Sequence, residues 1–114
     1  MNGGVTRMIS SDVMRGHLDA ILLCLIKERD CYGYELFSEI EKRTGGRLTI
    51  KEATLYAALQ RLEKQGRVSS YQGEVSGGSK RRYYHITSSG RLLLRELVDT
   101  WLEMRDIINI FLEN

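Results

Sequence analysis

The sequence predicts a mainly helical α+β fold of one small domain that ends in a long helix. Apolar residues recur at helical spacing in three segments between residues 13 and 65. Two strand-like segments around a Gly-Gly turn follow, and a fourth helical pattern then extends nearly to the end of the 114-residue chain. Proline is absent, which suits a helix-rich protein. No apolar run approaches the ~18 residues of a membrane span, and residues 1–10 lack the apolar core of a secretory signal, so we expect a cytoplasmic protein without membrane contact.

The first two helices are expected on either side of a short turn. The first runs from Val13 to Glu28 and is capped by Asp12. Its apolar positions are Leu18, Ile21, Leu22, Leu25 and Ile26. A turn at residues 29–31 leads into the second helix, residues 32–43, which Gly45 and Gly46 end because glycine is favoured beyond helix C-termini.

The third helix is expected over residues 51–65, after a brief extended stretch at residues 48–50, and Gly66 stops it. Its apolar face consists of Leu55, Ala58, Leu59 and Leu62. The opposite face consists of Ala53, Tyr56, Ala57, Gln60 and Lys64, with Thr54 and Arg61 beside it. This mixture of small, aromatic, amide and basic side chains differs from an ordinary Glu/Lys-rich solvent face.

A β-hairpin is expected next, with strands at residues 68–75 and 80–87. Alternation along the second strand places Arg82, Tyr84 and Ile86 on one face and Arg81, Tyr83 and His85 on the other. Because Tyr84 and Ile86 should point inward, Arg82 is a candidate for a structural contact over an aromatic ring. Lys80 and Arg81 are then the basic residues best placed for an external partner.

The last helix, capped by Thr87 or Ser88, is too long for the rest of the chain. About 25 residues span ~37 Å, which exceeds the width of such a small globule. Its apolar seam, with heptad spacing, consists of Leu94, Leu97, Trp101, Met104, Ile108 and Phe111. We therefore divide the chain into a domain at residues 12–87 and a dimerisation helix at residues 88–114, the alternative being a helix that folds back on its own domain.

Positive charge is concentrated in the middle of the chain. Residues 47–87 carry eight basic and three acidic side chains, a net charge of +5, whereas residues 1–46 and 88–114 carry −1 and −2. Three helices followed by a hairpin is the order of a winged helix-turn-helix, whose third helix enters the major groove. Together these features favour a DNA-binding protein. The alternatives are a basic face that is merely solvated, or a winged helix that contacts another protein.

The sequence resembles the PadR family of bacterial transcriptional regulators over residues 14–112. The motifs that carry the resemblance are YGYEL at residues 32–36, ATLYAAL at 53–59, RLE at 61–63, KRRYY at 80–84 and ITSSG at 86–90. It looks closest to a multidrug-sensing branch of small repressors with a single C-terminal helix. Ala57 stands where most of the family has proline, and Arg105 stands where the drug-binding branch has an acidic residue. The latter argues against a preference for cationic ligands.

The resemblance and the charge pattern together select the candidate DNA contacts. These are Lys51, Thr54, Tyr56, Gln60, Arg61, Lys64, Lys80, Arg81, Arg82 and Tyr34. We assign Tyr56 and Lys51 to phosphates and Thr54 and Gln60 to base edges. Tyr34 is open between a core position and a DNA contact. The expected partner is double-stranded DNA with an inverted repeat, bound by a homodimer that acts as a repressor.

Two facing copies of Trp101 near a two-fold axis could leave a slot for a planar aromatic ligand. Its expected lining is Trp101, Leu94, Leu97, Val98, Met104, Arg105, Ile108, Ala20 and Cys24. The alternatives are that Trp101 only anchors the interface, and that no ligand binds. No cofactor, metal cluster or catalytic constellation is expected. His17, His85, Cys24 and Cys31 are interpreted as structural, with a redox switch at Cys31 as the open alternative.

Overall fold

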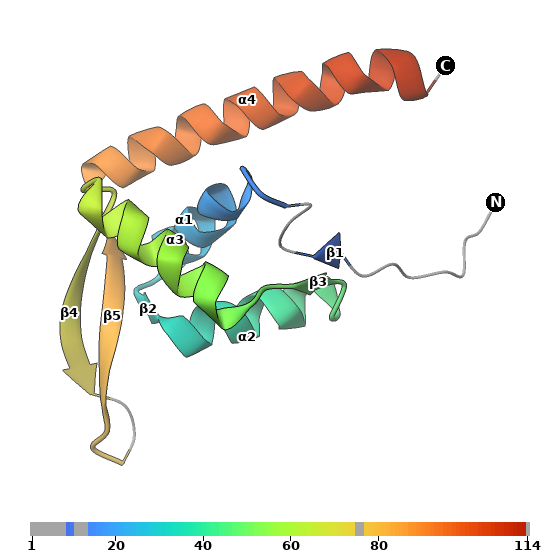
Figure 1. Cartoon of the computed structure of the whole chain (residues 1–114). Coiled ribbons are helices and arrows are strands. Elements are labelled where there is room, and N and C mark those ends of the chain that lie inside the picture. Colours follow the sequence, from blue (N-terminus) through green and yellow to red (C-terminus); the bar gives the residue numbers. More distant parts are fainter. Residues whose placement is uncertain (1–8, 11–13, 75–76, 114) are drawn as a thin grey trace.

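The computed structural model describes residues 9–10, 14–74 and 77–113 (Figure 1). The elements in chain order are β1 (Ile9–Ser10), α1 (Leu18–Glu28), β2 (Cys31–Tyr32), α2 (Gly33–Thr44), β3 (Leu48–Thr49), α3 (Glu52–Lys64), β4 (Val68–Glu74), β5 (Lys80–Ile86) and α4 (Ser88–Leu112). This order confirms the predicted α+β winged helix-turn-helix with a long C-terminal helix.

Helix α1 begins five residues later than the sequence pattern predicts. Residues 14–17 form a turn in which Gly16 has a φ of +93°, so regular helix starts only at Leu18. His17 takes the N-cap position without a side-chain hydrogen bond to the helix. The predicted cap, Asp12, and the predicted first residue, Val13, lie outside the described residues. The predicted start of this helix was therefore wrong.

The main sheet is antiparallel with the order β2-β5-β4. In the hairpin, Val68 pairs with Ile86 and Glu74 with Lys80, and Val75 of the predicted first strand lies outside the described residues. Strand β2 was not predicted: Cys31, expected in a turn, pairs with Tyr84 of β5. A second small sheet joins β1 and β3 in parallel. The two strands that were not predicted, β1 and β2, have only two residues each, which is too short to show an alternating pattern.

The two faces of the hairpin separate as predicted. Tyr84 and Ile86 point inward and are buried. On the outer face, Tyr83 stacks on Tyr71 with 5.6 Å between ring centroids and meets the edge of Tyr32 at 5.4 Å. The wing is therefore stiffened on its outer side by three tyrosines from three strands.

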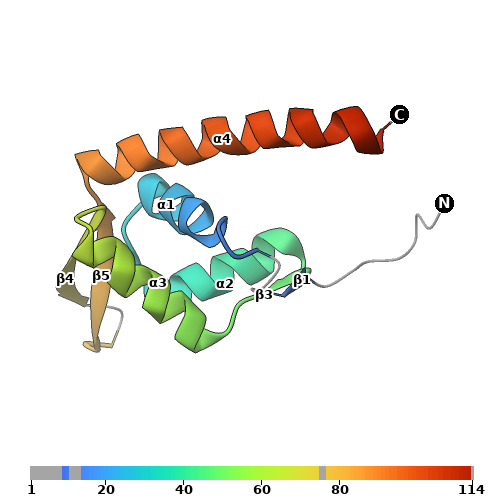
Figure 2. The ribbon, with the colours of Figure 1, turned by 45° about the horizontal axis from the view of Figure 1, so that its top comes forward.

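The core lies between α1, α2, α3 and the inner face of the hairpin. Its most completely buried side chains include Leu22, Leu23, Ile26, Leu36, Leu55, Leu59 and Leu62. Helix α4 lies across α1 (Figure 2), and its first half completes the core through Leu94, with Leu93 and Leu97 packed beside it. The second half of α4 extends past the core, which gives the molecule a longest dimension of 54 Å against 32 and 22 Å in the other directions.

The start of α4 is tied to the turn between α3 and β4 by a dense set of polar contacts. The Thr87 hydroxyl, which caps α4 by accepting from the Gly90 amide at 3.0 Å, lies 2.6 Å from the Gly66 carbonyl oxygen and 2.9 Å from that of Arg67. The Arg67 guanidinium donates to both the carbonyl and the hydroxyl of Ser89. The backbone of Gly90 packs directly against the Arg67 carbonyl. These contacts join the turn that follows α3 to the start of α4.

Candidate nucleic-acid interface

Helix α3 presents a sharply divided surface. Leu55, Ala58, Leu59 and Leu62 are buried, whereas Ala53, Tyr56, Ala57, Gln60 and Lys64 are exposed. The predicted division of this helix is thus confirmed. Lys51, at the N-cap of α3, is also exposed, and Thr54 is half-buried at the edge. The exposed residues form a face without large aliphatic side chains, as suits insertion into a groove.

Tyr56 extends from α3 to the beginning of α2. Its side chain is 42% exposed, and its ring lies against Gly33, the first residue of α2. Tyr34, the next residue of α2, is 67% exposed, so the possible core position for Tyr34 was wrong. The two tyrosines border a small cavity of about 230 Å³, with Phe37 and Ile50 beside it. Two phenol groups are therefore available on one surface at the α2–α3 corner.

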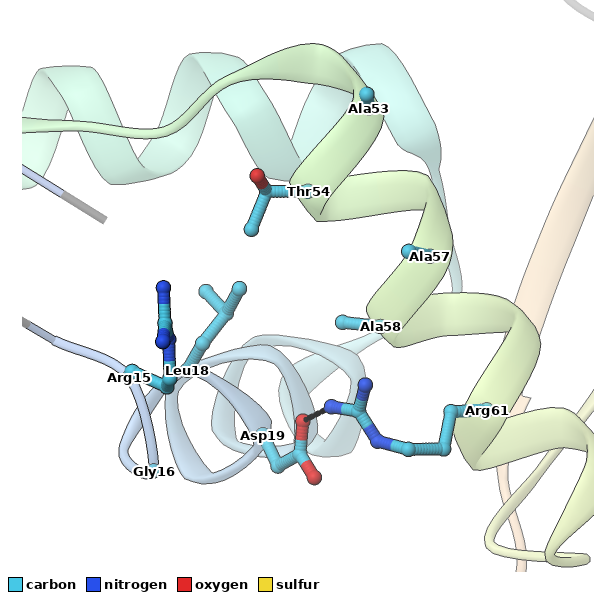
Figure 3. Close-up of a pocket in the computed structure, with 9 residues that line it drawn as sticks. All are labelled: Arg15, Gly16, Leu18, Asp19, Ala53, Thr54, Ala57, Ala58 and Arg61. Atoms are coloured by element: carbon cyan, nitrogen blue, oxygen red, sulfur yellow. Dashed lines mark hydrogen bonds and ion pairs between the residues drawn. The ribbon is translucent and has the colours of Figure 1, made fainter. Parts of the chain in front are cut away.

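Arg61 forms an ion pair with another residue of the same chain. Its guanidinium donates to the Asp19 carboxylate of α1 at 2.6 Å, across a hollow of about 420 Å³ between the two helices (Figure 3). Thr54 and Ala57 line the hollow on the α3 side, and Arg15 lines it before α1. Sequence reasoning missed Arg15 and Asp19 because neither carries a local signal of contact with α3.

The three basic residues that open β5 have different surroundings. Lys80, at the tip, is exposed. Arg82 donates to the Ser70 hydroxyl at 2.8 Å, and Ser70 donates to Glu63 of α3 at 2.5 Å, which links the hairpin to α3. Arg81 lies over the Tyr32 ring, 5.8 Å from its centroid. Arg82 is therefore structural as expected, but the predicted aromatic contact belongs to Arg81.

A third concavity, about 430 Å³ in volume and mostly apolar, lies between α1 and α4. Seven of the nine predicted ligand-binding residues line it: Trp101, Leu94, Leu97, Val98, Met104, Ala20 and Cys24. Ile108 and Arg105 do not. Arg105 instead lies over the Trp101 ring at 5.7 Å and contacts Asp106 at 3.0 Å. The structure adds Met14, His17, Ile21 and Thr100, which turn toward this groove from the start of α1 and from α4.

The far half of α4 exposes an unusual number of large apolar side chains. Of the predicted seam, Trp101, Met104, Ile108 and Phe111 are 46%, 39%, 45% and 73% exposed. The neighbouring exposed residues are Val98, Leu102, Ile107, Ile110 and Leu112. Leu94 and Leu97 of the seam are covered by the core of the same chain. The seam therefore begins inside the domain and continues uncovered beyond it.

Within the described residues, no three His, Cys, Asp or Glu side chains form a group that could bind a metal ion. Cys31 is buried, and burial raises the pKa of its thiol to about 11. A redox switch needs an accessible thiol with thiolate character, so the structure argues against one at Cys31.

His85 contacts Asp30 at 2.9 Å, and Tyr71 donates to the same carboxylate at 2.5 Å, which links the wing to the end of α1.

Comparison with known proteins identifies what this arrangement resembles. Residues 22–96 match the model of the Transcriptional regulator PadR-like family. An uncharacterised protein of Lysinibacillus sphaericus is 55% identical over 106 residues, which are 93% of this chain and 97% of that protein. A transcriptional regulator from Clostridium thermocellum has a similar structure, with a TM-score of 0.82 and 42% identity, covering 89% of this chain and 98% of that one.

A PadR-like transcriptional regulator from Bacillus cereus is also similar, with a TM-score of 0.79 and 29% identity, covering 90% and 98% of the two chains. Among the described residues, no helix has the length and apolarity required to cross a membrane.

Proposed function

This chain belongs to the PadR-like family of transcriptional regulators, and from that premise we propose that it is a cytoplasmic homodimeric repressor of an inverted-repeat operator. The observation that carries the proposal is the exposed, partly basic face of α3 set between the wing and the Tyr34–Tyr56 corner. In the bound state Gln60 and Thr54 reach base edges, while Tyr56, Lys51, Lys64, Lys80 and Arg81 contact phosphates.

The proposed dimer joins two chains through the uncovered half of α4. An apolar surface of this extent on one helix is costly to leave in water, and a second copy of the same seam would cover it. Two recognition helices then enter successive major grooves, about 34 Å apart on one face of the duplex.

The groove between α1 and α4 supports a further part of the proposal, a planar aromatic or hydrophobic inducer. Its volume of about 430 Å³ lies within the ordinary range for small-molecule sites. Met104 gives the wall adaptability, and Trp101, at its open side, supplies a flat aromatic surface. A bound ligand shifts the DNA-bound population only by its differential affinity for two arrangements of the dimer.

DNA binding is tested by fluorescence anisotropy with labelled DNA from upstream of the protein's own gene and an excess of nonspecific competitor. We expect salt-steep, competitor-resistant binding, with a log–log slope of about −0.9 per phosphate contact. Lys64→Gln should make that slope shallower by about one contact. Arg95→Gln, which removes the same charge from an exposed position of α4, is the matched control. Binding no tighter than competitor would refute the assignment of this operator.

Ligand binding is tested by the fluorescence of Trp101, the single tryptophan of the chain. Planar aromatic compounds should quench or shift this emission at micromolar concentration and should weaken operator binding at the same concentration. Cys24→Arg, which places a charge in the groove from the α1 side and leaves the exposed seam of α4 unchanged, should abolish both effects and keep DNA binding. Emission that ignores every planar compound tested would refute the inducer.

A further inference from the structure

Gly33 makes an unusually close contact with the recognition helix. A Cβ atom built on Gly33 would lie 2.5 Å from Cζ and 2.6 Å from Cε1 of Tyr56, and closer still to the hydroxyl oxygen. The three nearest atoms all belong to that one phenol ring. The ring of Tyr56 therefore occupies the space that any other side chain at position 33 would need.

The backbone of Gly33 does not itself require glycine. Its φ is not positive, in contrast to Gly16, Gly45, Gly46, Gly66, Gly77 and Gly78. It is the first residue of α2, where alanine is a better helix former than glycine. The conformation of the chain would thus accept alanine, and the obstacle is the end of a mobile side chain on another helix.

We propose that Gly33 is a positioning residue for DNA recognition, because it leaves the space in which the Tyr56 hydroxyl is held for a phosphate. The inference rests on the proposed DNA contact of Tyr56. An alanine at position 33 pushes the ring outward by rotation about its side-chain bonds, since Tyr56 is 42% exposed and free to move toward solvent. The fold is then preserved while the hydroxyl leaves its place.

We therefore expect Gly33→Ala to weaken operator binding without lowering the stability of the fold. The urea midpoint should be unchanged or higher, because alanine reduces the conformational freedom of the unfolded chain. Operator affinity should nevertheless fall about tenfold, the effect of losing one hydrogen bond to a charged group. The log–log salt slope should keep its value, because the lost contact is a hydroxyl and not a cation.

The test is a double-variant cycle by anisotropy on Gly33→Ala, Tyr56→Phe and the combination of both. Tyr56→Phe removes only the hydroxyl, so each single variant should bind about tenfold more weakly and the double variant should bind no more weakly than either. Ser38→Ala, another small change on α2, is the control and should bind as the wild type does.

The outcomes separate this inference from the proposed function. Wild-type affinity in Tyr56→Phe overturns the phosphate contact of Tyr56, and the inference with it, while leaving the rest of the interface standing. If Tyr56→Phe binds the operator weakly but Gly33→Ala binds it as the wild type does, only the inference about Gly33 is overturned. Losses that add fully in the double variant also overturn it, because Gly33 would then act independently of Tyr56. A lower urea midpoint for Gly33→Ala overturns it as well, because the weaker binding would then follow from a destabilised fold.

Discussion

The guanidinium of Arg61 and the carboxylate of Asp19 form an ion pair at 2.6 Å, although 42 residues separate them in the chain. Arg61 lies beside the exposed face of α3, on the side that faces α1 (Figure 3). An intramolecular carboxylate thus holds one of the cations that the sequence predicts as a DNA contact.

Asp19→Asn should therefore strengthen operator binding. The substitution releases Arg61 for a phosphate and removes a negative charge near the duplex, so we expect affinity to rise about two- to fivefold, with a steeper salt dependence. The free energy of unfolding should change by less than about 1 kcal/mol, because both side chains of the pair keep part of their surface in solvent. Anisotropy titrations at two salt concentrations and urea unfolding check both effects. Weaker binding would show that Asp19 instead orients Arg61 for its contact.

Gly90→Ala should destabilise the fold. A Cβ at this position would lie 2.9 Å from Cγ1 of Ile86 and closer still to the Arg67 carbonyl oxygen, and backbone cannot move aside as a side chain can. We expect a loss of about 1–3 kcal/mol in urea unfolding, typical of overpacking. Ser88→Ala, at the exposed first position of α4, serves as the control, and an equal loss there would locate the effect in helix capping instead.

The thiol of Cys31 should be unreactive in the folded protein. In a Cys24→Ser variant, a disulfide reagent at pH 8 should label Cys31 only after unfolding, because the native thiol is buried and its pKa is raised to about 11. The unfolded thiol titrates nearer 9. Between these values the unfolded state binds fewer protons than the native state, so Cys31 contributes a loss of stability as pH rises from about 9 to 11. Cys31→Ala should reduce this alkaline loss, as followed by thermal unfolding against pH.

Ile108→Glu should convert the proposed dimer into a folded monomer. Ile108 is 45% exposed in the single chain and lies outside the core, so a charge there costs the monomer little but prevents burial against a second copy. Light scattering should give half the mass, while circular dichroism should keep the helical signal. Glu103→Gln, on the same half of α4, should remain dimeric. An unchanged mass for Ile108→Glu would place the interface elsewhere.

Local sequence patterns predict the helices, the hairpin and the face of α3, because the spacing of apolar residues in each of these elements depends only on residues close together in the sequence. The burial of Leu55 and Leu62 and the exposure of Gln60 follow directly from a 3.6-residue repeat. The contacts that escaped prediction depend on residues distant in the chain. Strand β2 exists only because Cys31 meets Tyr84, and the start of α1 depends on the conformation of Gly16.

The side-chain contacts of the candidate site could not be predicted for the same reason, because they join residues that are distant in the chain. Alternation separates Arg81 from Arg82 correctly, but it cannot show that Tyr32 lies beneath Arg81 or that Ser70 lies beside Arg82. Heptad spacing selects most of the residues that line the groove between α1 and α4, but the predicted slot lay between two copies of Trp101, and ligand binding there stays a prediction. Helical spacing also places His17 on the face of Ala20 and Cys24, so its position in this lining could have been predicted from the sequence.

The division of α3 into a buried and an exposed face has a consequence for how such a protein can evolve after gene duplication. Ala53, Ala57 and Gln60 contribute no buried side chain to the core, whereas Leu55, Leu59 and Leu62 are almost completely buried. Duplicated copies of such a gene can therefore exchange the exposed set and acquire new operators while the inherited scaffold keeps its stability. A fold of this kind can diversify into many separate regulatory circuits within one genome through a few substitutions on one helix.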